Sequence, residues 1–262
     1  MVDFHTHTSL CEHATGSAAD YVASAVSKGL SVIGISDHAP LPDGLREGVT
    51  MRPGDIEGYI SSVEAARDAF AERIEVRVGF EVDFPLHDTF DRRYFTDPRI
   101  DYLIGSCHYI GTWPMDHPDY KDDYFRRGVD TVYSDYYDSL EACAASGLFN
   151  IIGHFDLAKK FGYRPMKDMT KKITAVAKAA ARTNTAVEMN TAGLRKPVGE
   201  IYPSPEIVKI LFDCDVPVTL GSDAHAPEEV GSDFAKAIEL VRDAGYRRIA
   251  TFEKRRLSFI NL

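Results

Sequence analysis

Seven of the nine histidines in this chain follow short apolar runs, usually with an acidic residue close by. They are spread along most of the sequence: His5, His7, His13, His38, His108, His154 and His225. Glu81 belongs to the same series, because it follows Gly79 and Phe80. Imidazole and carboxylate are the usual ligands of borderline and hard divalent cations. The series therefore indicates a fold that gathers many strand ends around several metal ions, and it favours hydrolytic chemistry.

Seven short runs of strand character alternate with stretches of helical periodicity. The strand-like runs span residues 2–4, 32–35, 75–80, 102–104, 149–152, 186–189 and 216–220. Apolar residues at helical spacing lie between or after them, within residues 21–26, 56–70, 173–180, 207–211 and 234–241. Ser204-Pro205-Glu206 predicts one helix start, with a capping residue, a proline and an acidic residue in order. This alternation predicts a parallel sheet with helical crossovers.

The candidate ligands follow six of the seven predicted strands, always at the C-terminal end. An open parallel sheet gathers its ligands at one switch point between a few strands. A barrel instead brings every strand end to one shared mouth. Convergence of so many strand ends therefore favours an α/β barrel of seven strands. Because no linker or low-complexity tract divides the sequence, we expect a single domain over residues 1–262.

Composition narrows the classes of partner. A hydrophobic content of 44% over 262 residues is ordinary for a protein with a sizeable core. The net charge of −10 argues against a nucleic-acid groove built on bulk basic charge. No apolar run approaches the roughly 20 residues that span a bilayer, and no signal peptide is visible. We therefore expect a cytoplasmic protein that acts on a small molecule, without nucleic acid or membrane, while its oligomeric state stays open.

The four cysteines do not form a metal-binding or redox pattern. Cys11, Cys107, Cys143 and Cys214 are widely spaced and include no Cys-x-x-Cys pair. Free thiols are the expectation for such a chain. Cys11 and Cys107 flank candidate ligands, but the neighbouring histidines suit a divalent cation better, so we expect both thiols to be spectators.

The N-terminal pair His5 and His7 is the nucleus of the predicted metal centre. Residues two apart on a strand point to the same face, so both imidazoles can bind one ion. A His-x-His pair alone is a weak signal. It gains weight because further histidines and carboxylates follow other strands: His13, Asp37-His38 and Asp223-x-His225.

Individual members of the series also have plainer interpretations. His108 or His154 taken singly is more often a hydrogen-bonded core histidine, and Glu81 could be an ordinary rim carboxylate. For Asp37 we favour a role in orienting a neighbouring histidine over direct ligation. His87 and His117 fall in polar loops and are predicted to lie outside the centre. Together, however, a barrel mouth filled with histidines and carboxylates has no structural purpose.

The complete set of residues resembles the polymerase and histidinol phosphatase (PHP) superfamily, from residue 3 to about residue 230. Within it the chain resembles the monofunctional histidinol-phosphate phosphatases. The segments that carry this closer resemblance are His108-Tyr109-Ile110, Trp113-Pro114-Met115-Asp116, His154-Phe155-Asp156-Leu157, Lys160-Phe161-Gly162 and Asn190-Thr191-Ala192-Gly193-Leu194-Arg195-Lys196. The resemblance implies a distorted (β/α)7 barrel with three divalent ions at its C-terminal mouth, and hydrolysis of L-histidinol phosphate.

The resemblance also implies how the ligands divide among the ions. The first ion would be held by His5, His7, Glu81 and Asp223. Glu81 would bridge to a second ion held also by His108 and His154. The third would be held by His13, His38 and His225. Each position has the residue type that the superfamily pattern requires. Zinc, iron and manganese all suit such ligands, so the sequence does not identify the metal.

Phosphate hydrolysis requires cations beyond the metal ions, and the chain offers several candidates. Arg195 is the first choice, because it follows the sixth predicted strand and guanidinium binds phosphate bidentately. Lys160 and Arg164 are further candidates. Trp113 and Asp116 would supply an aromatic wall and a carboxylate for the organic part of the substrate. Glu81, Asp223, Asp37 and Arg195 are thus the predicted catalytic residues, while the donor of the leaving-group proton is not apparent.

Three other functions compete with this interpretation. A nucleotide or oligonucleotide phosphoesterase of the same superfamily would keep the metal centre but change the substrate. An amidohydrolase-like enzyme also uses His-x-His on its first strand, but expects a lysine at a strand end, and Lys159 and Lys160 fall several residues beyond His154. A non-catalytic metal-binding barrel would close its coordination with protein ligands, whereas nine ligands for three ions leave open positions.

Overall fold

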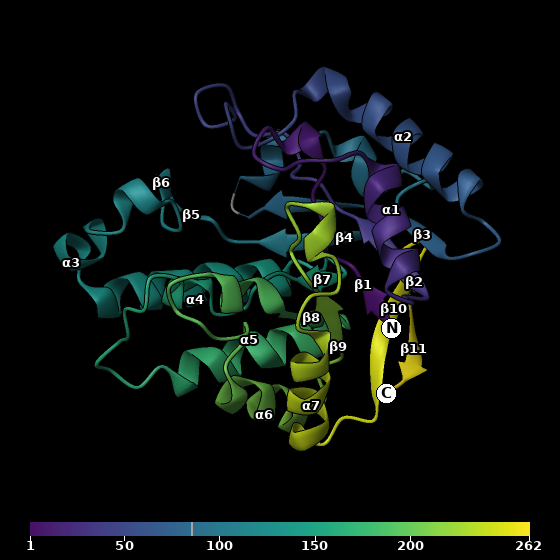
Figure 1. The fold of residues 1–262 in the computed structure, drawn as a ribbon. Helices are drawn as coiled ribbons and strands as arrows, with labels where there is room; N and C mark the ends of the chain where they lie inside the picture. Colours follow the sequence, from purple (N-terminus) through teal and green to yellow (C-terminus); the bar gives the residue numbers. More distant parts are fainter. Residues whose placement is uncertain (85) are drawn as a thin grey trace.

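A computed structural model describes residues 1–84 and 86–262, and seven parallel strands form its centre (Figure 1). The strands lie side by side in chain order: β1 (Val2–Asp3), β2 (Val32–Ile35), β3 (Glu75–Asp83), β4 (Tyr102–Ser106), β7 (Ile151–Ile152), β8 (Ala186–Asn190) and β9 (Val218–Gly221). Beyond β1 and β9, Phe4 N donates to Leu220 O at 3.0 Å and His7 N to Ala224 O at 2.9 Å. These few bonds close the ring, so the predicted seven-stranded barrel is confirmed in a distorted form.

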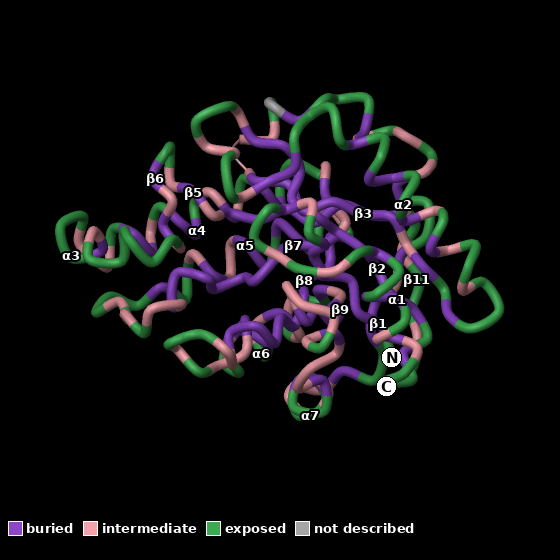
Figure 2. The backbone as a smooth tube through the Cα atoms, turned by 45° about the horizontal axis from the view of Figure 1, so that its top comes forward, coloured by how far each residue is buried: buried purple, intermediate pink, exposed green. Residues whose placement is uncertain are grey.

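Helices cover the outside of the barrel. The crossover helices are α1 (Ala18–Ser27), α2 (Ile56–Ala69), α4 (Val129–Ala145), α5 (Thr170–Thr183) and α6 (Pro205–Asp213); a short α3 (Asp123–Arg127) precedes α4, and α7 (Phe234–Ala244) follows the last barrel strand. In Figure 1, α1 and α2 lie along one side and α4 to α7 along the other. Figure 2 shows the strands buried and the outward faces of the helices exposed. No helix in the described part of the chain is long and apolar enough to cross a membrane.

α4 was not predicted, although this 17-residue helix is the longest among the described residues. Its buried face consists largely of Tyr133, Tyr136, Tyr137 and Leu140, interleaved with aspartate and serine. Tyrosine carries a polar atom, so a face built from it gives a weak periodic hydrophobic signal. The start of α6 follows the prediction, with Ser204 in an extended conformation before Pro205.

Two β-hairpins were not predicted. β5 (Tyr109–Ile110) and β6 (Trp113–Pro114) form one after β4, and β10 (Arg248–Glu253) and β11 (Arg256–Asn261) form the other at the C-terminus. The C-terminal hairpin packs against the N-terminal ends of the strands. Lys254 N donates to Asp101 Oδ1 just before β4, and the ring of Phe252 lies 5.6 Å from that of Phe4. The hairpin therefore closes the barrel at the N-terminal ends of the strands. An active site is expected at the opposite end, where the strands have their C-terminal ends.

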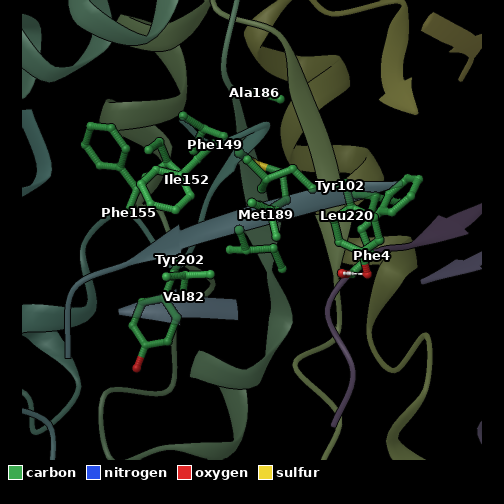
Figure 3. Packing of buried hydrophobic residues seen from close by; sticks show 14 of the residues in the cluster. Phe4, Val82, Tyr102, Phe149, Ile152, Phe155, Ala186, Met189, Tyr202 and Leu220 are labelled. Atoms are coloured by element: carbon green, nitrogen blue, oxygen red, sulfur yellow. Dashed lines mark hydrogen bonds between the residues drawn. The ribbon is translucent and has the colours of Figure 1, made fainter. Parts of the chain in front are cut away.

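Large apolar side chains from the strands and the segments around them pack together in the core (Figure 3). The ring of Tyr102 lies across β2 and β3, and its hydroxyl donates to Phe4 O at 2.7 Å. Glycine is required beneath it, because a Cβ at Gly34 would lie 2.1 Å from the tyrosine Oη and one at Gly79 would lie 2.4 Å from its Cζ. The barrel is thus a packed core rather than a channel.

Candidate metal centre

Glu81 lies at the centre of a cluster of histidines at the C-terminal mouth of the barrel. Its carboxylate is 1% exposed, and five imidazole nitrogens from four segments of the chain approach it. The nearest nitrogen of each ring lies at 3.2 Å for His5, 3.5 Å for His7, 3.1 Å for His38, 3.5 Å for His108 and 3.0 Å for His154. A single buried carboxylate with so many imidazole neighbours is placed to bridge cations.

Asp223 supplies a second carboxylate on the β9 side of the cluster. Its Oδ1 lies 3.3 Å from His7 Nε2 and 3.8 Å from His5 Nε2. The residue has a left-handed conformation, with φ of 50°. Aspartate tolerates this conformation better than most residues do. The sharp turn directly after β9 brings the side chains of Asp223 and His225 to the same mouth.

The imidazoles of His13 and His225 face each other in an arrangement that favours the binding of a cation. Their Nε2 atoms are 3.0 Å apart. His13 Nδ1 donates to Cys11 O at 2.7 Å, and His225 Nδ1 donates to Asp223 O at 3.0 Å. With each proton on Nδ1, both Nε2 atoms carry lone pairs directed at one another. Two such lone pairs repel unless a positive ion lies close to both.

Unpaired buried nitrogens give a second indication that the cluster suits metal ions. His5 Nε2, His7 Nε2 and His38 Nδ1 are buried and have no hydrogen-bond partner within the described residues. A buried polar atom without a partner costs free energy, and coordination to a cation removes that cost. The donors are imidazole and carboxylate, so the set fits a divalent metal.

Electrostatics divide the histidines into two groups. Burial lowers the pKa of His7 to about 3 and also lowers the pKa of His38 and of His225, so these rings are neutral and ready to coordinate. Burial opposes protonation of His5 and His108 as well, but nearby carboxylates outweigh it and raise both pKa values well above the usual range. A cation that binds at these two rings must displace protons.

The structure groups the ligand atoms much as the sequence prediction does. Within the described residues, the sets His5–His7–Glu81, Glu81–His108–His154 and His7–His38–His225 each have ligand atoms within 4.8 Å of one another. The first two correspond to the first two predicted ion positions. The third contains His7 where the prediction has His13. The nine residues are therefore brought together, while their division among ions stays a prediction.

The structure places Asp37 differently from His87 and His117, the two histidines predicted to lie outside the metal centre. Asp37 is fully buried and accepts hydrogen bonds from the backbone N and the hydroxyl of Thr8, so it anchors the segment after His7. Burial raises its pKa to about 6. His87 stacks on Phe84 with ring centres 4.7 Å apart, away from the cluster. His117, in contrast, lines the cavity described next.

A cavity of about 420 Å³ opens over the cluster. Its wall beyond the metal ligands includes Tyr109, Asp116, His117, Lys160 and Lys196. Lys160 Nζ lies 2.8 Å from Asp116 Oδ2. Burial opposes ionisation of Asp116, but Lys160 outweighs it and holds the pKa of that carboxyl at about 2. The cavity thus presents both a fixed cation and a fixed anion opposite the cluster.

Three predicted substrate contacts lie elsewhere. Arg195, in a 3-10 helix after β8, donates to Ser222 O at 2.9 Å and pairs with Glu229 at 3.3 Å. Its Nη1 is buried and has no partner within the described residues. Arg164 pairs with Glu200 and lines a separate hollow. Trp113 is buried under Arg127, whose guanidinium lies 4.3 Å from its ring centre. None of the three is among the described residues that line the 420 Å³ cavity.

The residues behind the ligands were not predicted from the sequence. Glu188 on β8 faces His5, and its Oε2 lies 2.8 Å from His5 Nδ1. Asp83 Oδ1 lies 3.0 Å from His108 Nδ1. Glu188 and Asn190 alternate with apolar residues on β8, so they share one face of the strand. A glutamate inside an apolar strand is the signal that could have identified this residue.

The absence of a side chain at Gly221 leaves space for the contact between Glu188 and His5. A Cβ at Gly221 would lie 2.4 Å from Glu188 Oε2 and 2.8 Å from His5 Cβ. We expect Gly221→Ala to lower the free energy of unfolding by about 1–3 kcal/mol, as overpacking does, in urea denaturation. Gly58→Ala in α2 is the matched control, because no atom of the described residues outside its own stretch of helix lies within 4 Å of its Cβ position. An equal effect of both substitutions would contradict the steric explanation.

Comparison with known proteins places this site in a family. The model of the PHP domain matches residues 3–192, most of the barrel and seven of the nine predicted ligands. The chain belongs to the PHP domain family. The family resemblance inferred from the ligand pattern is therefore confirmed.

Other PHP proteins match over nearly the whole chain. A probable histidinol-phosphatase of Deinococcus radiodurans is 40% identical, covering 98% of each chain. A histidinol-phosphatase of Bacillus subtilis is 26% identical, covering 90% of this chain and 98% of the relative. The crystal structure of histidinol phosphate phosphatase from Lactococcus lactis, complexed with Zn, L-histidinol and phosphate, aligns with a TM-score of 0.82, 19% identity and 98% coverage of each chain. At that identity the structural match shows the shared fold.

Proposed function

We propose that this PHP domain is a metal-dependent phosphomonoesterase that hydrolyses L-histidinol phosphate to L-histidinol and inorganic phosphate. The observation that carries the proposal is 40% identity to a probable histidinol-phosphatase across 98% of both chains. The open histidine cluster beneath the cavity supports it, since a purely structural metal site would be closed by protein ligands. A volume near 420 Å³ lies in the range of sites for small metabolites.

Each part of the chain has a proposed task at this site. The nine clustered residues hold up to three divalent ions, for which zinc, iron and manganese are the candidates. Such ions, when bound, acidify a water molecule and neutralise phosphate charge. Glu81 holds neighbouring ion positions together, and Asp223 completes the first of them. Lys160 and Lys196 face the cavity from outside the cluster, where their ammonium groups bind phosphate oxygens. We keep Arg195 as a phosphate ligand through its unpartnered Nη1.

The organic part of the substrate is proposed to meet Asp116. Histidinol phosphate carries an amine that is cationic at neutral pH, and a carboxylate with a depressed pKa remains ionised to receive it. Asp116 already pairs with Lys160, so substrate binding divides the pair: the lysine turns to phosphate and the aspartate to the amine. The exposed ring of His117 lies on the same cavity wall.

Steady-state kinetics after reconstitution with zinc, iron or manganese tests the proposal. Histidinol phosphate should give a higher kcat/KM than nucleotide monophosphates or a simple aryl phosphate. In heavy-oxygen water the label should enter inorganic phosphate, because attack is at phosphorus. A preference for nucleotides would favour the competing phosphoesterase, and label in the alcohol product would contradict attack at phosphorus.

A further inference from the structure

β8 is the barrel strand that carries none of the predicted metal ligands, yet it places a carboxylate directly beneath the cluster. Glu188 is fully buried. Its Oε2 and Oε1 lie 2.8 Å and 3.0 Å from His5 Nδ1. Oε1 also accepts the backbone N–H of His154 at 2.7 Å. One carboxylate thus contacts two predicted ligand residues, one after β1 and one after β7.

The contact with His5 determines which nitrogen of that ring faces the ions. A carboxylate at Nδ1 holds the proton there, so the lone pair of the neutral ring, once a metal has displaced the second proton, belongs to Nε2. His5 Nε2 points into the cluster, 3.2 Å from Glu81, and has no hydrogen-bond partner within the described residues. Glu188 therefore prepares the ring to coordinate through Nε2 and orients it at the same time.

Asn190 extends this link to the opposite side of the first ion position. Its Nδ2 donates to Glu188 Oε1 at 2.8 Å and to Asp223 Oδ2 at 3.2 Å. One amide thus connects the carboxylate behind His5 with the carboxylate predicted to bind the same ion. Asn190 Oδ1 accepts from Ala192 N at 2.9 Å, which fixes the orientation of the amide.

A second buried carboxylate nearby, that of Asp3, makes contacts of a structural kind and serves as a comparison for Glu188. Asp3 is as fully buried as Glu188 and lies two residues before His5. It accepts from Ser222 N, Ser222 Oγ, Gly231 N and the backbone N of His5. These donors join β1 to the end of β9, and none of them is an imidazole. Glu188 differs because both of its oxygens contact the imidazole ring of a predicted ligand, at 2.8 and 3.0 Å.

We propose that Glu188 is a positioning residue, linked through Asn190 to Asp223, and that its negative charge sets the metal affinity of the His5 position. The inference rests on the metal dependence in the proposed function, but not on the identity of the substrate. It assigns to β8 the task of holding predicted ligands that follow β1, β7 and β9 in register around the ions.

Zinc affinity of the Glu188→Gln variant tests the proposal. Glutamine keeps the length of the side chain and one acceptor oxygen but removes the charge. Titration of the metal-free proteins against a chromophoric chelator should show one zinc site weakened about 10- to 100-fold, as for other residues behind metal ligands. Asp3→Asn is the matched control: it should lower the thermal midpoint but leave every zinc affinity within about threefold, since Asp3 contacts no imidazole.

Several outcomes would overturn the proposal. Wild-type affinity at every site of Glu188→Gln is one, and equal loss of affinity in Asp3→Asn is another. Should Glu188→Gln fail to fold, nitrogen NMR of the zinc-loaded wild-type protein, labelled at histidine, decides the question. His5 should be protonated at Nδ1 and zinc-bound at Nε2, and the reverse would refute the inference. If the wild-type protein binds zinc without hydrolysing histidinol phosphate, the proposed function fails while this inference stands.

Discussion

Glu81→Gln is expected to lower kcat/KM for histidinol phosphate by more than about a thousandfold and to reduce the number of metal ions retained. Residues behind metal ligands typically contribute 10- to 100-fold to affinity or activity. Glu81 should contribute more, because its carboxylate is the common neighbour of five imidazoles, which are predicted to belong to more than one ion position. Glutamine fills the same volume, so the change isolates the loss of the bridging charge.

Glu75→Gln provides the control for Glu81→Gln. Glu75 begins the same strand, β3, but is exposed and pairs with Arg77 at the closed end of the barrel. Kinetics and metal analysis of this variant should match those of the wild-type protein. A Glu81→Gln variant that retains both full activity and full metal content would contradict the bridging role.

The barrel was predictable because its signals are local. Each strand is a short apolar run, and the residue at its C-terminal end lies at the mouth of the barrel. This position does not depend on contacts with distant parts of the chain. Gly79-Phe80-Glu81 and Gly221-Ser222-Asp223 are examples: both place an acidic side chain in the cluster. The same reasoning applies to His5 and His7, whose separation by two residues on a strand sets their common face.

The remaining features depend on contacts between distant parts of the chain. Arg195 stays a predicted phosphate ligand, but its contacts with Ser222 O and with Glu229, in the short 3-10 helix after β9, were not predictable from local pattern. Glu188 escaped notice because its partner His5 lies 183 residues away in the sequence. Trp113 packs under Arg127, a residue of α3 that the strand and helix pattern does not place. Local periodicity determines which face a residue occupies, but not which side chain meets it there.

Metal removal should destabilise the protein strongly. Any ligand that binds only the folded state at 100 times its Kd adds about 2.7 kcal/mol to the free energy of unfolding. For a chain of this size each kcal/mol corresponds to roughly 2–4 °C in Tm, so one saturated site should raise Tm by about 5–10 °C. Several sites should add further. Scanning calorimetry of the metal-free protein with and without zinc measures this shift.

His7→Gln and His117→Ala separate the cluster from the cavity wall in this experiment. His7 is fully buried among the predicted ligands. It belongs to two of the sets of predicted ligands whose atoms lie within 4.8 Å of one another. His117 lies on the cavity wall and its Nδ1 accepts from Asp119 N. The zinc-induced shift should shrink in the first variant and persist in the second. An undiminished shift in His7→Gln would place the bound zinc outside the cluster.

The zinc-induced shift should also grow as pH rises from about 6 to about 8, since metal ligands bind in their deprotonated forms. The sign follows from His5 and His108, whose pKa values are raised by nearby carboxylates despite burial. The metal-free protein holds protons on these rings in this pH range, and zinc must displace them, so each proton released makes binding tighter at higher pH. His7, His38 and His225 have lowered pKa values and are already neutral, so they contribute little to this dependence. A shift that is constant over this pH range would show that zinc binds without displacing protons from His5 and His108.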